Sequence, residues 1–398
     1  MIDPWTEFRS APGVRTRETA VYFERTGPGR SGGVAQWAIS GEPARTIGLR
    51  DSYEALALET ERHLRSPRRR AVAGYLGFDA IGLSERRLRT PPAGSPFPLG
   101  EIAYLDRVRV ARVPPRSLRM SRRGPDPGIP REDTLPRPAY ERSVRRLIGQ
   151  IRAGEAFQIV LSHRRGWDRP GDLLDRAGRL RSSERSAYFY YLRFGDREIV
   201  GASPESVVEV EGRRARVNPI AGTRPRGASG RGRRPLTTDP KELAEHRMLV
   251  DLARNDLGRI ARPGMVRLRW TEQTVRLARI EHLVSRVEAT LKPGVGPWEA
   301  LASTLPAGTV SGAPKIRATE LLRAEEQSWR GPYAGTVGWI SARNRADWAL
   351  AIRTGFASGD RLYSSAGAGI VHRSVPSREY DETLAKLSLV ESVLVGGR

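Results

Sequence analysis

The sequence contains no cysteine among its 398 residues. This absence excludes disulfide bonds, thiolate zinc and iron–sulfur sites, and any cysteine nucleophile within the chain. The sequence also lacks a run of about 18 apolar residues, which a membrane-spanning helix would need. Its first residues, MIDPWTEFRS, lack the basic and apolar segments of a signal peptide. We therefore expect a cytoplasmic protein without a membrane partner.

Lysine is nearly absent as well, although the chain is strongly basic. Only four of the 68 basic residues are lysines, and the formal net charge is +23. A nucleic-acid-binding protein would use such a charge to contact phosphates, but would gather it on a tail, a stripe or one helix face. The arginines are instead spread along the chain, with denser groups at 68–70, 122–123 and 224–234. We expect no nucleic-acid partner, and a non-catalytic nucleic-acid-binding protein stays the competing interpretation.

Proline and strand-like segments divide the chain into three regions. Residues 1–114 mix short apolar runs with one helical pattern, and residues 115–138, together with Pro114, hold seven prolines that indicate a linker. Residues 139–398 form the longest region. Strands and helices do not alternate regularly, so a doubly wound parallel sheet is disfavoured. The sequence predicts an α+β fold with large antiparallel sheets.

Apolar periodicity and end signals predict the individual elements. Asp239 and Ser377 are the expected caps of two helices, and Pro240 is the expected first residue of one of them. The expected helices are 53–64, 140–153, 239–258 and 377–393. The expected strands are 20–23, 34–39, 72–77, 102–110, 156–162, 187–193, 333–340, 348–354 and 362–366.

Two pairs of carboxylates could carry chemistry. Glu242 and Glu245 lie three residues apart on one expected helix. Glu379 and Glu382 have the same spacing on another helix, with Lys386 four residues further on. Four carboxylates from two helices could form the all-oxygen site that Mg²⁺ prefers. The alternative is that each pair is a solvated helix face and that Glu242 only supports a helix start.

Glycine-rich turns and scarce side chains give further candidates. Turns at 219–222, 305–314, 331–335 and 365–369 could bring backbone N–H groups close to an anion, or could be ordinary turns. Each of the five histidines is more often structural than catalytic. Three of the four lysines, at positions 241, 315 and 386, lie in or beside the candidate segments. This placement suggests a need for an ammonium group that arginine does not meet.

Ten ordered segments carry a family resemblance. They are GEAFQIVLSHRR (154–165), GASPESVVEV (201–210), NPIAGTRPRG (218–227), KELAEHRMLVDLARNDLGRI (241–260), EHLVSRVEATL (281–291), TLPAGTVSGAPKIRATELL (304–322), RGPYAGTVGW (330–339), AIRT (351–354), SSAGAGIV (364–371) and EYDETLAK (379–386). These segments resemble the chorismate-binding core of anthranilate synthase component I, which aminodeoxychorismate, isochorismate and salicylate synthases share. GYLGFDAIGLSER (74–86) extends the resemblance towards the N-terminus. The resemblance implies two large antiparallel sheets packed face to face and flanked by helices, with residues 1–114 completing the sandwich and 139–398 forming the catalytic core.

The resemblance also implies chorismate as the substrate, Mg²⁺ as the cofactor, and roles for individual residues. Glu205 matches the general acid that protonates the departing C4 hydroxyl group, and His282 matches the histidine linked to pyruvate release. Lys386 matches a residue beside the carboxylate cradle. The residues that match the Mg²⁺ site are Glu242, Glu245, Glu379 and Glu382. The residues that match the substrate pocket are Gly222, Thr223, Thr309, Tyr333, Arg353, Gly367, Ala368 and Gly369.

Two positions select the nucleophile within this family. Isochorismate and salicylate synthases have a water-activating lysine where this sequence has Gln158, and a neutral amide cannot act as that base. Most aminodeoxychorismate synthases have a nucleophilic lysine where this sequence has Ala221. The resemblance therefore implies direct addition of ammonia at C2 of chorismate. The product would be 2-amino-2-deoxyisochorismate, followed by anthranilate and pyruvate.

Two alternatives stay open within the family. The chain could be a synthase of specialised metabolism that releases 2-amino-2-deoxyisochorismate, or it could be aminodeoxychorismate synthase component I. His282 is compatible with complete turnover and does not exclude the first alternative. Related glutaminases use a cysteine nucleophile, which this chain lacks. We therefore expect a separate glutamine amidotransferase subunit as the source of ammonia, in a homo- or hetero-oligomer.

Overall fold

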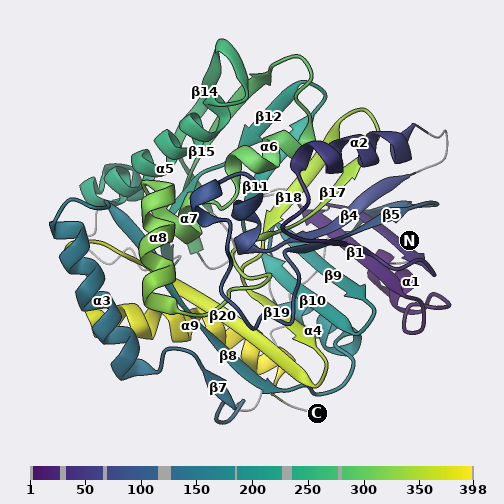
Figure 1. The fold of residues 1–398 in the computed structure, drawn as a ribbon, viewed down its shortest axis with the longest axis horizontal. Coiled ribbons are helices and arrows are strands. Elements are labelled where there is room, and N and C mark those ends of the chain that lie inside the picture. Colours follow the sequence, from purple (N-terminus) through teal and green to yellow (C-terminus); the bar gives the residue numbers. More distant parts are fainter. Residues whose placement is uncertain are drawn as a thin grey trace.

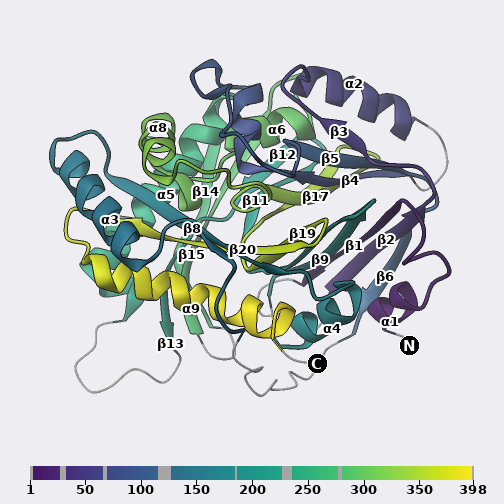
Figure 2. The same cartoon turned by 60° about the horizontal axis from the view of Figure 1, so that its bottom comes forward.

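The structure is a computed structural model that describes residues 3–26, 33–65, 70–114, 127–183, 186–225, 235–276 and 280–396. Two ten-stranded antiparallel sheets form two layers (Figures 1 and 2). The first sheet contains, in spatial order, β16 (Gly312–Ala313), β8 (Gln158–Asp168), β20 (Arg361–Ile370), β19 (Thr354–Ser358), β10 (Arg197–Ser203), β9 (Tyr188–Phe194), β1 (Thr19–Thr26), β2 (Gly33–Ser40) and β6 (Arg109–Val113), with β7 (Glu132–Asp133) beside β8. The second contains β13 (Ile220–Pro225), β15 (Ile280–Leu291), β12 (Arg214–Val217), β11 (Ser206–Glu211), β18 (Arg345–Leu350), β17 (Thr336–Ser341), β4 (Ala71–Leu76), β5 (Gly100–Leu105) and β3 (Arg45–Ile47), with β14 (Ala261–Arg276) beside β15.

Helices cover the outer faces of the two sheets. The α-helices are α1 (Pro4–Arg9), α2 (Tyr53–Leu64), α3 (Arg137–Arg152), α4 (Leu174–Ser183), α5 (Pro240–Gly258), α6 (Pro297–Thr304), α7 (Gly308–Ser311), α8 (Lys315–Glu326) and α9 (Pro376–Leu394). Short 3-10 turns are η1 (Phe78–Leu83), η2 (Arg86–Leu88) and η3 (Leu236–Thr238). Figure 2 shows α4 and α9 outside the first sheet and α2 and α6 outside the second. None of the helices within the described residues is long and apolar enough to span a membrane.

Alternation along the strands explains the face-to-face packing. Val21 and Phe23 of β1 belong to a buried cluster in which Phe194 of the first sheet stacks on Tyr75 of the second. Ala20 and Tyr22, which point to the opposite face, belong to a separate cluster with residues of α1, α4 and α9. Because both faces of this strand are buried, its residues 20–23 are all apolar instead of alternating with polar ones. The inner cluster is the contact between the sheets, which confirms the α+β fold expected from the sequence.

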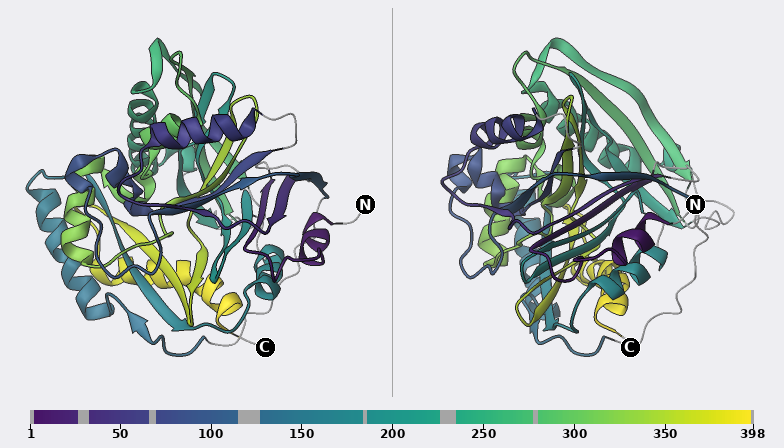
Figure 3. Two further views of the ribbon diagram at one scale, coloured as in Figure 1. Left: turned by 45° about the vertical axis from the view of Figure 1, so that its right-hand side comes forward. Right: turned by 90° about the vertical axis from the view of Figure 1, so that its right-hand side faces the viewer.

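The N-terminal region contributes strands to both layers. β1, β2 and β6 lie in the first sheet, and β3, β4 and β5 lie in the second. Within the expected linker at 115–138, residues 115–126 lie outside the described residues, and β7 pairs with β8. At the other edge of the second sheet, β14 and β15 form a long curved antiparallel pair (Figure 3). The division at 114 and 138 stays a prediction.

Two of the expected strands were wrong because each divides between the sheets. The 102–110 segment separates into β5 and β6, and the 348–354 segment separates into β18 and β19. Arg107 and Arg353 lie at these breaks with φ angles of 56° and 51°. A left-handed residue turns the chain out of one sheet towards the other. Arginine gives no signal for that conformation, which is typical of glycine.

The helix ends follow the expected signals at α2 and α5, whereas α3 begins at Arg137 instead of 140 and α9 begins before its expected cap. α2 has the expected bounds, and α5 begins at Pro240 after Asp239, whose Oδ1 accepts a hydrogen bond from the backbone N–H of Glu242 at 3.4 Å. The expected cap at Ser377 was wrong, because α9 begins at Pro376 after Val375. Proline favours the first helical position through its fixed φ, so it places the start one residue before the serine.

A bidentate ion pair bridges the two sheets and provides a test of this packing. Arg197 of β10 donates to both carboxylate oxygens of Glu101 of β5, at 2.6 and 2.9 Å, and Glu101 is only 1% exposed. Arg197→Met would leave this carboxylate buried without its cation. We expect a loss of about 3 kcal/mol in the free energy of unfolding, measured by urea denaturation. Glu101→Gln combined with Arg197→Met should lose clearly less, and equal losses in the two variants would contradict this account.

Candidate active site

Glu205 lies where the chain crosses from one sheet to the other. β10 ends at Ser203 in the first sheet, and β11 begins at Ser206 in the second. The backbone N–H of Glu205 donates to Ser203 Oγ at 3.3 Å, and its carbonyl oxygen accepts from the N–H of Leu350 at 3.0 Å. These bonds fix the backbone of the crossover. The carboxyl group is therefore held between the layers.

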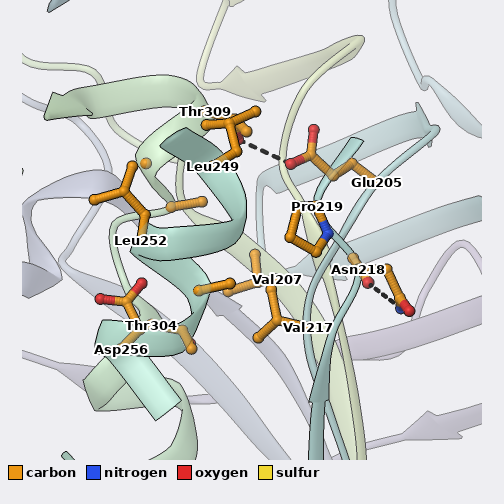
Figure 4. Close-up of a pocket in the computed structure, with 14 residues that line it drawn as sticks. Glu205, Val207, Val217, Asn218, Pro219, Leu249, Leu252, Asp256, Thr304 and Thr309 are labelled. Atoms are coloured by element: carbon orange, nitrogen blue, oxygen red, sulfur yellow. Dashed lines mark hydrogen bonds between the residues drawn. The ribbon is translucent and has the colours of Figure 1, made fainter. Parts of the chain in front are cut away.

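The surroundings of Glu205 favour the protonated carboxyl group. Burial raises its pKa to about 7, while a hydrogen bond from Thr309 and the positive charge of Lys386 act in the opposite direction. The Thr309 hydroxyl, on α7, donates to Oε1 of Glu205 at 2.8 Å (Figure 4). A carboxyl group with this pKa is partly protonated at neutral pH. The arrangement therefore suits a general acid, as the sequence predicts for Glu205.

Lys386 reaches the same region from α9, which packs along β20. Its Nζ donates to the carbonyl oxygen of Gly367 at 2.8 Å and pairs with Glu382 at 2.7 Å. The ammonium group is thus tied to the glycine-rich strand, although the side chain is 47% exposed. Its charge also acts on Glu205. The fold therefore brings Glu205, Thr309, Gly367 and Lys386 together from four separate segments.

The glycines of β20 leave no room for side chains. A Cβ atom on Gly367 would lie 3.2 Å from the Tyr333 hydroxyl, and one on Gly369 would lie 2.5 Å from Nε2 of Gln158. Ala368 lies between them, and its side chain points to the other face of the strand. Burial raises the pKa of Tyr333, so its hydroxyl keeps its proton and can donate. A bare strand edge beside donors fits the predicted carboxylate cradle.

Arg353 occupies the break between β18 and β19. Its carbonyl oxygen accepts a hydrogen bond from the N–H of Ala202 at 3.2 Å, which holds it beside the end of β10. Burial lowers the pKa of the Arg353 guanidinium because desolvation disfavours its charge. An anionic ligand would restore that lost solvation. A forked guanidinium in this position is suited to a carboxylate, as predicted.

The turn expected at 219–222 was wrong, because residues 220–222 belong to strand β13, which pairs with the strand that carries His282. In β13, Ala221 pairs with Leu283 of β15 and Thr223 pairs with His282, with an irregular step at Gly222. The side-chain positions of residues 222 and 223 lie outside the described residues. His282 is 8% exposed. The strands therefore bring the segment predicted to cover the ring and the predicted elimination residue side by side.

The four predicted Mg²⁺ ligands lie on helices of different sheets. Glu242 and Glu245 are on α5, which packs against β13 and β15, while Glu379 and Glu382 are on α9, which packs against β20. Within the part of the chain that the structure describes, no three His, Asp or Glu side chains are close enough to hold a metal ion. The donor chemistry nevertheless fits, because all four side chains offer the oxygen ligands that Mg²⁺ prefers.

A small cavity of about 40 Å³ lies beside Glu205, between α5, α7 and the start of β11 (Figure 4). Apolar residues line much of its wall, and its polar lining residues are Glu205, Ser206, Asn218, Asp256, Thr304 and Thr309. A cavity that binds benzene has a volume of about 150 Å³, so this one is too small for a six-membered ring. The cavity by itself is therefore not the substrate site.

Sequence reasoning did not select Ser203 or Asp256. Ser203 precedes the acid by two residues and fixes its backbone, and no pattern marks a lone serine at a strand end. Asp256 was detectable, because it follows Val250 and Ala253 at helical spacing on the buried face of α5. A carboxylate on an apolar helix face needs a partner.

Comparisons with known proteins agree with this geometry. The pattern of the chorismate binding enzyme family matches residues 18–392. Anthranilate synthase component 1 of Thermus thermophilus is 40% identical over 380 residues, covering 87% of this chain and 82% of that protein. The protein of the same name from Saccharolobus solfataricus is 38% identical, covering 81% and 80%. The solved structure of anthranilate synthase component I from Streptococcus pneumoniae has a TM-score of 0.74 at 30% identity, covering 98% of this chain and 97% of that one. The resemblance carried by the ten segments is confirmed.

Glu205→Gln removes the transferable proton and keeps the size of the side chain. We expect kcat with chorismate to fall by about 10²- to 10⁴-fold while chorismate binding is retained. In the unsubstituted chain, kcat should decline at alkaline pH with an apparent pKa at or above about 7. Thr309→Val should move this decline to higher pH, because loss of the hydrogen bond disfavours the carboxylate. Turnover and binding assays across pH with saturating ammonia test both variants, and unchanged turnover in Glu205→Gln would refute the role.

Proposed function

This chain belongs to the chorismate-binding enzyme family, and from that membership we propose that it adds ammonia to C2 of chorismate and forms anthranilate and pyruvate. It is an enzyme of the chorismate-utilising class that resembles anthranilate synthase component I. The observation that carries the finer proposal is the half-buried Glu205 carboxyl, whose pKa desolvation raises to about 7 and which accepts a hydrogen bond from Thr309. An acid of this kind is needed to expel a ring hydroxyl group.

In the first step, the nitrogen of ammonia bonds to C2 of chorismate. Both ring double bonds shift, the C4–O bond breaks, and the Glu205 proton leaves with the hydroxyl group as water. The added nitrogen loses one proton to solvent, which gives 2-amino-2-deoxyisochorismate. In the second step, the C2–H and C3–O bonds break and the ring becomes aromatic. The released enolpyruvate gains a proton on its methylene carbon and becomes pyruvate, which balances the proton lost from C2. We assign His282 to this elimination, since its strand lies opposite the segment predicted to cover the ring.

Two neutral side chains support ammonia as the nucleophile. Gln158 lies against Gly369, at the strand that would hold a substrate carboxylate, and an amide there supplies no base for water. Ala221 lies in β13 opposite Leu283 and supplies no amine for covalent attack on C2. Tyr333 and Arg353 would bind the enolpyruvyl carboxylate. The backbone of residues 367–369 would bind a carboxylate beside Lys386.

Mg²⁺ is the proposed cofactor. Glu242 and Glu245 on α5 and Glu379 and Glu382 on α9 would hold it, directly or through water. When bound, Mg²⁺ would supply a positive charge and ligand positions for the ring carboxylate of chorismate. Glu382 now pairs with Lys386, so metal binding would require that ion pair to rearrange.

A separate glutamine amidotransferase is the proposed partner. The chain has no cysteine with which to release ammonia from glutamine by the thiolate route. The curated relatives are called component 1, which implies a second component for those proteins. Free ammonia would replace glutamine and the partner in the assay below.

The purified chain should convert chorismate and saturating ammonium salt to anthranilate and pyruvate at alkaline pH. Products are identified by mass, with Mg²⁺ present and, in parallel, with a chelator and no added metal. We expect both products with Mg²⁺, none with the chelator, and recovery when Mg²⁺ is restored.

Other products would each contradict a stated part of the proposal. An aminated product that keeps the enolpyruvyl group would replace it with a synthase that stops at the intermediate, or with aminodeoxychorismate synthase if the amine is on C4. Isochorismate formed without ammonia would refute the argument from Gln158. Full activity with the chelator would refute the need for Mg²⁺.

A further inference from the structure

Lys315 is a scarce lysine that the proposed reaction does not use. It begins α8, and its Nζ donates to both carboxylate oxygens of Asp256 at 2.9 Å and to the carbonyl oxygen of Thr304 at 3.1 Å. The Lys315 and Asp256 side chains are only 11% and 12% exposed. Three acceptors match the three donors of an ammonium group, whereas the planar guanidinium of arginine has a different donor geometry. The site therefore accounts for a lysine in a chain that otherwise uses arginine.

This ion pair joins three helices around the segment that carries Thr309. Asp256 lies near the end of α5, Thr304 ends α6, and Lys315 starts α8. The ten residues between Thr304 and Lys315 include α7, on which Thr309 lies. Lys315 therefore fixes both ends of that segment relative to α5.

α5 packs against α7, and Thr309 on α7 contacts Glu205. A Cβ atom on Gly308 would lie only 2.7 Å from Cδ1 of Leu252, so α7 rests directly on α5. Asp256, Leu252, Thr309 and Glu205 all line the same small cavity (Figure 4). A shift of α5 against α7 would therefore change the 2.8 Å contact between Thr309 and Glu205.

We propose that Asp256 and Lys315 are positioning residues for the acid: their ion pair holds the 305–314 segment so that the Thr309 hydroxyl stays bonded to the Glu205 carboxyl group. This inference rests on the proposed role of Glu205 as the proton donor. Stability alone does not demand such a pair, because buried ion pairs can often be replaced by uncharged residues of similar volume at little cost. The function of the pair is to set a geometry.

The test is a double-mutant cycle that compares the loss of kcat on removal of the ion pair with the loss of kcat on removal of the Thr309 hydroxyl group. Asp256→Asn with Lys315→Met removes both charges together, so no unpaired ion is buried. In the otherwise unchanged chain, we expect kcat to fall by about 10- to 100-fold, as misplacement of a catalytic group does, with less change in KM for chorismate. The alkaline decline of kcat should move to higher pH, as in Thr309→Val.

In the Thr309→Val background, the same pair replacement should cause little further loss, because the two changes act through one contact. Unchanged kcat after removal of the pair, or an equal fold-loss in both backgrounds, would overturn the proposal. Lys315→Arg is a second variant that keeps the charge and changes only the geometry. It should show the same direction of change in kcat and pH profile, and behaviour like the unsubstituted chain would also overturn the proposal.

A matched control separates positioning from stability. Arg181 pairs with Glu24 at 2.8 Å, both side chains are almost fully buried, and they lie on the outer face of the first sheet. Glu24→Gln with Arg181→Met should lower the melting temperature and leave kcat and its pH profile unchanged.

Failure of the proposed acid and failure of the positioning role give different results. If Glu205→Gln retains activity, Glu205 is not the acid. If Glu205→Gln is inactive but the losses of kcat from the pair replacement and from Thr309→Val simply add, only the role of the pair is refuted.

Discussion

The site depends on the removal of one carboxyl group, that of Glu205, from water. Burial alone raises its pKa, and one hydroxyl group and one ammonium group limit the rise to about 7. A fully solvated glutamic acid would be ionised at neutral pH and could not donate a proton. A carboxyl group with stronger donors would be ionised as well. The balance between desolvation and the Thr309 bond therefore decides whether this position can act as an acid.

The two-sheet architecture creates that desolvated position. Residues 204–205 connect β10 to β11 across the layers, and Arg353 turns the chain between the same two sheets at a left-handed φ. The backbone of Glu205 and of Arg353 therefore lies where the chain leaves one sheet and enters the other. Hydrogen bonds from Leu350 to Glu205 and from Ala202 to Arg353 connect the backbones of the two crossings to the strands beside them. Two of the proposed site residues, Glu205 and Arg353, lie at these crossings, whereas His282 and the glycines of β20 lie within strands.

The sequence predicted much of the fold and most of the site segments, for reasons visible in particular residues. Asp239 and Pro240 mark the start of α5 because cap chemistry is local. The positive φ of Arg353 could not be predicted from the local sequence, because strands that are distant in the sequence determine the backbone conformation where the chain passes between the sheets. Ser377 matches the sequence signal of a helix cap, but α9 begins one residue earlier, at Pro376. The bond between Thr309 and Glu205 joins residues 104 positions apart, which no local pattern encodes.

Direct titration of the Glu205 carboxyl group tests the central claim. Carbon-13 NMR of the labelled chain would follow its resonance with pH, and the spectrum of Glu205→Gln would assign it. The account predicts a midpoint at about 7 in the chain without substrate. A midpoint near the ordinary value of about 4.3 would contradict it, because the carboxyl group would then be ionised at neutral pH.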